Sequence, residues 1–216
     1  MITHIDRATL SLSTPLGSLY CRLRVHGELP PDACGPYSIR SSSIDPYLPP
    51  GVSVAGCFGI LVSLRADSTV TDLRFECRWA GRPPSCTGPD TGQGRDAQGW
   101  QTETHTLLIG TDDVEELSAR YGSQVTLVSD PDGYPIEYSD EGLAVCIAQL
   151  PAGVDLSLHF VVAWNTLPEP DDCACVYAVN ISHWRLAVML ARGEQSHPPE
   201  PTVGPVSNGD SSPPAR

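Results

Sequence analysis

The sequence predicts an all-β protein, an antiparallel β-sandwich of the jelly-roll kind with one short helix, and a closed β-barrel is the alternative. Apolar and polar residues alternate in several segments, most clearly from Val154 to Trp164, which is typical of strands with one buried face. Glycine and proline are frequent between these segments, where turns are expected. Only one stretch has the start and stop signals of a helix.

The N-terminal part is expected to begin with a hairpin, because residues 8–13 and 18–26 alternate on either side of a Pro-Leu-Gly turn. A second hairpin is predicted from strand 52–64, apolar on both faces, to strand 71–79. A close backbone approach or a bulge is expected at Gly56 and Gly59 in the first of these two strands. In the second, the outward side chains should form cross-strand ion pairs on a wet face; they are Asp72, Arg74, Glu76 and Arg78.

Two long segments without periodicity, residues 27–51 and 80–99, are predicted to be loops. Such loops are uncommon in compact domains unless they are functional, although segment 27–51 could equally be a crossover between sheets. Loops that gather at one end of a sandwich can form a binding surface. The candidate binding residues in these segments are Tyr37, Tyr47, Arg82 and Arg95.

The predicted helix lies in residues 112–122, where Asp112 and Glu115 have capping-box spacing and Gly122 suits the end. The acidic residues at its start are explained by the helix dipole, without a metal ion. Further along, Asp130 and Asp132 are predicted to belong to a turn rather than a calcium loop, because the third oxygen ligand is missing.

The segment from Gly142 to Leu190 is predicted to form successive strands, at 143–150, 154–164 and 173–181, with a shift of the apolar phase near Ser182. One domain is expected over residues 1–192. Residues 193–216 lack periodicity and are predicted to be a disordered tail rich in proline and serine.

The eight cysteines are expected to be reduced, although Cys34 and Cys86 could pair in an oxidising compartment. Cys173 and Cys175 should lie on one face of a strand, and no second pair at zinc spacing accompanies them. The sequence therefore predicts no metal site and no cofactor.

Asp155, Ser157 and His159 lie on one face of the predicted strand 154–164 and suggest a catalytic triad. Residues two apart on a strand are separated by about 6.5–7 Å, which exceeds hydrogen-bond reach. An exposed polar face is therefore predicted, and no P-loop, Gly-x-Ser-x-Gly or His-Glu-x-x-His motif occurs. The sequence favours a protein that is not an enzyme.

The net charge of −13 argues against a nucleic-acid partner, because phosphate binding needs clustered positive charge. The N-terminus does not resemble a secretion signal, and no apolar run reaches the roughly 18 residues of a membrane span, so a soluble cytoplasmic protein is expected. All 13 basic residues are arginine, which suggests a GC-rich, bacterial genome.

These observations predict a non-catalytic binding or interaction module that presents its long loops to a protein or carbohydrate partner. The alternative is a small-molecule enzyme or carrier with a barrel-type cavity near Trp164, Tyr177 and His159.

Overall fold

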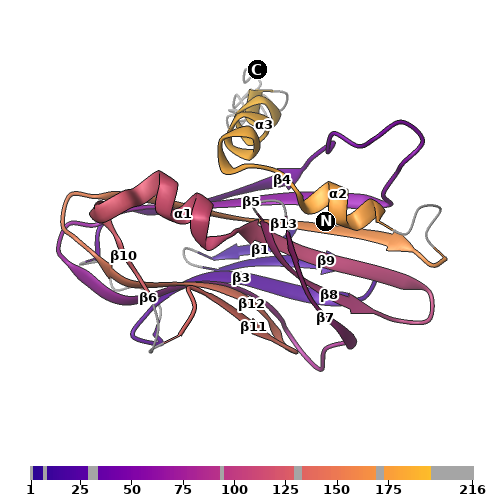
Figure 1. The fold of residues 1–216 in the computed structure, drawn as a ribbon, viewed down its shortest axis with the longest axis horizontal. Coiled ribbons are helices and arrows are strands. Elements are labelled where there is room, and N and C mark those ends of the chain that lie inside the picture. Colours follow the sequence, from indigo (N-terminus) through magenta and orange to yellow (C-terminus); the bar gives the residue numbers. More distant parts are fainter. Residues whose placement is uncertain are drawn as a thin grey trace, which may run out of the picture.

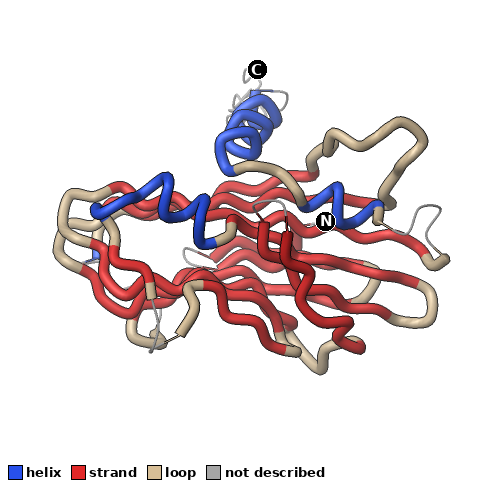
Figure 2. Tube along the Cα trace, viewed as in Figure 1, coloured by secondary structure: helices blue, strands red, loops and turns tan. Residues whose placement is uncertain are grey.

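Two antiparallel β-sheets face each other in a computed structural model that describes residues 2–6, 9–28, 34–92, 95–128, 133–168 and 173–195 (Figures 1 and 2). The predicted sandwich is confirmed. The sheets remain separate layers, so the described residues form no closed barrel. They include three α-helices, where the sequence predicted one short helix.

The first layer, sheet A, has the strand order β1-β2-β3-β6-β12-β10, and β11 also pairs with β12. Strands β2 and β3 form the predicted N-terminal hairpin. The strands of sheet A are β1 (Ile2–Asp6), β2 (Thr9–Thr14), β3 (Gly17–Val25), β6 (Val70–Trp79), β10 (Thr126–Leu127), β11 (Ile136–Ser139) and β12 (Gly142–Leu150).

The second layer, sheet B, has the order β4-β5-β13-β9-β8-β7. Strand β13, the longest, lies at its centre between β5 and β9. The strands of sheet B are β4 (Tyr37–Ser43), β5 (Gly56–Arg65), β7 (Ser85–Gly92), β8 (Arg95–Gln101), β9 (His105–Asp112) and β13 (Asp155–Thr166).

The second predicted hairpin is wrong, because β5 belongs to sheet B and β6 to sheet A. The chain crosses between the layers in the short connection that was expected to be a hairpin turn. The two strands have different surroundings: helices cover the outer face of β5, whereas the outer face of β6 carries charges. That difference explains why β5 is apolar on both faces and β6 on one only.

Both predicted loops contain strands. Segment 27–51 includes β4, and segment 80–99 includes β7 and most of β8. β4 and β7 are the two edge strands of sheet B, where half-exposed polar residues and a proline are tolerated. Their sequences therefore lack the alternation by which the central strands are predicted.

Helix α1 (Val114–Tyr121) is close to its predicted position, with Asp113 as N-cap and Gly122 at its end, followed by a short 3-10 turn (Gly122–Gln124). The segment predicted as a strand at 173–181 is instead helix α2 (Ala174–Val179). The residues after the expected phase shift near Ser182 form helix α3 (His183–Gln195). Their buried residues have helical spacing, which removes the need for a phase shift. These are Ala174, Cys175, Ala178, Val179, Leu186 and Leu190.

Cys173 and Cys175 were predicted to lie on the same face of a strand. This prediction is wrong, because a helix begins here: Cys173 is exposed and Cys175 is buried against sheet B. The prediction for Asp130 and Asp132 lies outside the described residues, and so does the part of the predicted tail, 193–216, that follows Gln195. Helix α3 itself extends past residue 192.

The middle of sheet B is buried on both faces. The main core fills the space between the sheets, where the rings of Phe75 and Phe160 stack with centroids 4.6 Å apart. A second core lies between the outer face of sheet B and helices α2 and α3. The helices approach closely at glycines: a Cβ on Gly59 would lie 2.4 Å from Leu186 Cδ1. The close approach predicted at Gly59 is thus found, and α3 is fixed against β5.

Candidate functional site

The four predicted binding residues are not gathered into one site. Arg82 lies in the exposed turn between β6 and β7, and Arg95 is buried on β8, with only 9% exposed. Tyr37 lies at the start of β4, whereas Tyr47 lies in the connection from β4 to β5. The two tyrosines line two separate hollows of the surface.

Tyr47 lines a groove of about 390 Å³ between its loop and helix α3. We call this the aromatic groove, and it is lined by Asp45, Pro46, Tyr47, Trp184, Arg185, Val188, Met189 and Arg192. The side chains of Tyr47 and Trp184 are 79% and 69% exposed. The guanidinium of Arg185 lies over the Tyr47 ring, 5.4 Å from its centroid, at a cation–π distance.

The groove follows from how α3 docks. Leu186 and Leu190 hold one side of the helix on sheet B, and Met189 packs against the edge of this core. The opposite side is exposed, and it carries Trp184, Arg185, Val188 and Arg192. Trp184 was missed as a binding residue because a strand pattern placed it on the buried phase. The helical spacing of Arg185, Met189 and Arg192 was the signal that could have found this face.

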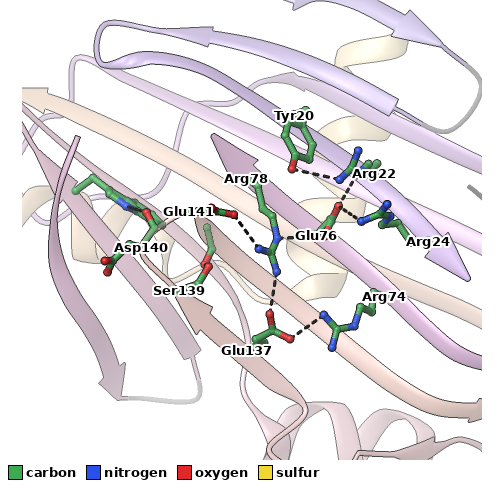
Figure 3. A network of polar contacts seen from close by, with 12 residues as sticks. Tyr20, Arg22, Arg24, Arg74, Glu76, Arg78, Glu137, Ser139, Asp140 and Glu141 are labelled. Carbon is green, nitrogen blue, oxygen red and sulfur yellow. Dashed lines mark hydrogen bonds and ion pairs between the residues drawn. The ribbon is translucent and has the colours of Figure 1, made fainter. Parts of the chain in front are cut away.

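A second polar surface covers the outer face of sheet A (Figure 3). At its centre the buried carboxylate of Glu76 accepts a hydrogen bond from Arg22 and lies 3.1 Å from Nε of Arg78. Arg78 in turn donates to Glu137 at 2.8 Å, and Glu137 also pairs with Arg74 at 2.8 Å. The ion pairing predicted for this face of β6 is found, with β3 and β11 as partner strands. These ion pairs join β3, β6 and β11 across the outer face of sheet A.

The third polar region is an ionic cluster under α1, on the outer face of sheet B. Asp112, at the end of β9, is buried, and Nη2 of Arg120 donates a hydrogen bond to it. Nη1 of Arg95 lies 3.4 Å and Nδ1 of His159 3.3 Å from its carboxylate oxygens. Burial would raise the pKa of Asp112, but His159 and Arg120 outweigh it and hold the pKa well below its usual range.

This cluster corrects two predictions. Asp112 belongs to a buried ion network and is not merely a first-turn acid of α1. His159 is only 1% exposed, so the predicted exposed polar face is wrong at this residue. Within the described part of the chain, no group of three or more His, Cys, Asp or Glu side chains is arranged to hold a metal ion.

Ser157 is held next to this cluster by side chains of α1. The hydroxyl of Tyr121 accepts a hydrogen bond from the Ser157 N–H at 2.7 Å, and Arg120 donates to the Ser157 carbonyl at 2.9 Å. The Ser157 Oγ lies 2.9 Å from Nε2 of His183, at the start of α3. Asp155, by contrast, pairs with Arg65 on the exposed surface. Of the three residues considered as a triad, Asp155 pairs with Arg65, His159 with Asp112, and Ser157 contacts a different histidine, His183.

Comparison of the sequence with protein-family models and with curated proteins finds no match. Among solved structures the chain is similar to one described as "Putative kojibiose phosphorylase from human microbiome". The TM-score is 0.32 and the identity 9%, over 87% of this chain and 20% of that chain. The chain thus spans about a fifth of that protein's length. Of the helices that the structure describes, none combines the length and the apolar character of a membrane span.

Proposed function

We propose that the protein is a non-catalytic carbohydrate-binding module and that the aromatic groove holds the sugar. The observation that carries this proposal is that two exposed aromatic side chains, Tyr47 and Trp184, line one groove although they come from segments far apart in the sequence. Exposed large aromatic residues have a cost in water, and a concave surface that gathers two of them is a common feature of ligand sites. Of the four residues predicted from the sequence, Tyr47 belongs to this groove.

The chemistry of the groove suits a sugar ring. Pyranose rings have apolar C–H faces that can pack on aromatic rings, and their hydroxyl edges both donate and accept hydrogen bonds. Asp45 and Arg185 supply an acceptor and donors beside the rings. The guanidinium of Arg185 lies over one face of the Tyr47 ring. Because the Tyr47 side chain is highly exposed, the ring remains accessible to a ligand.

The size of the groove favours a small ligand over a protein. Its volume of about 390 Å³ falls in the range of about 300–1,000 Å³ that is typical of small-molecule sites. A stable protein interface buries about 800 Å² on each partner and has an extended apolar centre. The other large exposed apolar residues among those described, Tyr134, Val176 and Tyr177, do not line the groove.

Tryptophan fluorescence provides the test, because Trp184 is exposed while Trp79 and Trp100 are buried and Trp164 is partly buried. The full chain is titrated with neutral gluco- and manno-oligosaccharides and with uronic-acid oligosaccharides. A bound sugar removes water from Trp184, so a saturable blue shift is expected. Tyr47→Ala should raise the half-saturation concentration at least tenfold.

Tyr177→Ala is the matched control, since Tyr177 is also an exposed tyrosine but lies on α2, outside the groove. This variant should bind like the unchanged protein. The proposal fails if no oligosaccharide shifts the emission, or if Tyr47→Ala binds a sugar as well as the unchanged protein does. Retention of a protein ligand that Trp184→Ala abolishes, without sugar binding, would assign the groove to a protein partner instead.

A further inference from the structure

We propose that Ser157 is a nucleophile, activated by His183, that hydrolyses small carboxylic esters in the hollow beside it. This activity is separate from sugar binding in the aromatic groove, and neither proposal depends on the other. The observation that carries it is the 2.9 Å contact of the Ser157 Oγ with Nε2 of His183. A hydroxyl within hydrogen-bond reach of an imidazole is the minimal arrangement of a serine nucleophile and its base.

Ser157 is accessible to a ligand from an open hollow of about 410 Å³. The hollow is lined by Pro36, Tyr37, Ser38, Ser63, Leu64, Arg65, Asp155, Leu156 and Ser157, from β4, β5 and β13. Its volume suits a small organic ester. Tyr37, predicted from the sequence as a binding residue, lies in its wall, while Tyr47 does not.

His183 can act as the base because it is neutral near pH 7. Burial lowers the pKa of His183 to about 4, and the positive charges of Arg120 and Arg40 act in the same direction. A neutral imidazole accepts the serine proton, whereas an imidazolium cannot. An imidazole of low pKa is a weaker base than free imidazole, so the expected turnover is slow.

The surrounding residues fix both partners. Tyr121 and Arg120 bind the backbone of Ser157, and Asp112 anchors Arg120 from below. The ring of His159 packs edge-on against that of His183, with centroids 5.8 Å apart. The buried Nε2 of His159 has no hydrogen-bond partner in the part of the chain that the structure describes. The negative charge of Asp112 attracts the imidazolium that forms on His183.

The reaction runs in two halves. Ser157 Oγ forms a bond to the ester carbonyl carbon while its proton passes to Nε2 of His183, and the hydroxyl of Ser63, 3.3 Å from Oγ, can donate to the oxyanion. The bond to the alcohol oxygen then breaks, and His183 returns the proton to the departing alkoxide. Water attacks the acyl-Ser157 with His183 as base, which releases the acid and restores the serine. The net reaction is ester plus water to acid plus alcohol.

A fluorophosphonate probe tests the nucleophile directly. Ser157 Oγ forms a bond to phosphorus as the P–F bond breaks, fluoride leaves, and His183 accepts the proton. Intact-mass analysis and peptide mapping should find one adduct per chain, on Ser157. Ser157→Ala should remove it, and His183→Gln should slow labelling at least 100-fold. Hydrolysis of p-nitrophenyl acetate should fall about 100-fold in Ser63→Ala, the lower end of the loss that follows removal of one oxyanion donor.

Three comparisons keep the test specific. Ser18→Ala, at an exposed serine of sheet A, should label like the unchanged protein, and circular dichroism checks that each variant is folded. Tyr47→Ala should also label normally, which separates this site from the aromatic groove. The proposal is overturned if the unchanged protein takes up no probe at millimolar concentration, if the adduct lies elsewhere, or if folded His183→Gln labels at the unchanged rate.

Discussion

Asp112 is a residue whose replacement is expected to have a large effect on stability. Its buried carboxylate faces Arg95, Arg120 and His159. Asp112→Ala removes this carboxylate from the buried guanidinium of Arg95 and the partly buried guanidinium of Arg120, and breaking a buried ion pair costs about 3–5 kcal/mol. Urea unfolding should show a loss of this size.

Asp155→Ala is the control for this prediction, because the pair of Asp155 with Arg65 is exposed on both sides. Exposed ion pairs contribute about 0–1 kcal/mol, so this change should be nearly neutral. Equal losses in the two variants would show that the cluster around Asp112 does not stabilise the fold.

The pH dependence of stability is also set by single residues. The pKa of His183 is about 4 in the fold, where Arg40, Arg120, Asp112 and His159 face it, and about 6.5 in an unfolded chain. Between these values the unfolded state binds a proton that the folded state does not, so stability falls as the pH drops from 6.5 to 4. Below about pH 4, protonation of Asp112, whose folded pKa is lowered, removes further stability.

Urea unfolding at several pH values checks this. His183→Gln should remove the part of the loss between pH 6.5 and 4 and leave the loss below pH 4 unchanged. If the variant and the unchanged protein lose the same stability between pH 6.5 and 4, the pKa of His183 is not lowered by folding.

Sequence patterns predict the surroundings of some residues but not of others. The outward charges of β6 follow from alternation, and their ion pairs are present. Ser157 and His183, however, are 26 residues apart, and their contact depends on how α3 docks. Period-2 geometry excludes the triad with Asp155 and His159, but it contains no information on side chains that come from another element.

At the scale of elements, capped helices were predictable and short uncapped ones were not. Helix α1 has an N-cap aspartate and a terminal glycine within its own sequence. Helix α2 has no side-chain cap, and an apolar run of this length fits a strand or a helix equally. The segment is helical because Ala178 and Val179 pack against sheet B, and this packing depends on the tertiary fold.

The docking of α3 on β5 provides the prediction at this scale. A Cβ on Gly59 would overlap Leu186 Cδ1, and overpacking of this kind costs about 1–3 kcal/mol. Gly59→Ala should therefore destabilise the protein. In combination with Leu186→Ala the loss should be smaller than the sum of the two single losses, because the truncated side chain makes room.

Gly81→Ala is the matched control, since a Cβ at Gly81 has no atom within 4 Å. It should leave the unfolding free energy within about 0.5 kcal/mol of the unchanged value. Strict additivity of Gly59→Ala and Leu186→Ala would mean that α3 does not lie against β5 at this point.

At the scale of the whole molecule, the two sheets share one main core. Phe75 of sheet A stacks on Phe160 of sheet B, so neither sheet can keep its inner face buried alone. Thermal unfolding followed by far-UV and near-UV circular dichroism should give coincident transitions. Phe160→Ala should cost about 3–5 kcal/mol and shift both transitions together. Two separate transitions would show that the layers are independent units.

The two faces of the sandwich differ in their surroundings. The outer face of sheet A is covered by its own ion pairs (Figure 3). The outer face of sheet B carries helices α2 and α3 (Figure 1). Both proposed sites lie beside these helices. The sandwich class follows from composition and alternation. Composition and alternation do not predict which strands share a sheet. Strands β5 and β6 are neighbours in the sequence, yet they belong to different sheets.

The proposed sugar-binding groove is tested most directly by titrating the intact protein with oligosaccharides while the emission of Trp184 is recorded. We expect a saturable blue shift that disappears in Trp184→Phe, weakens at least tenfold in Tyr47→Ala and is unchanged in Tyr177→Ala. Emission that stays constant with every oligosaccharide, or a shift that persists in Trp184→Phe, would contradict the assignment of the groove.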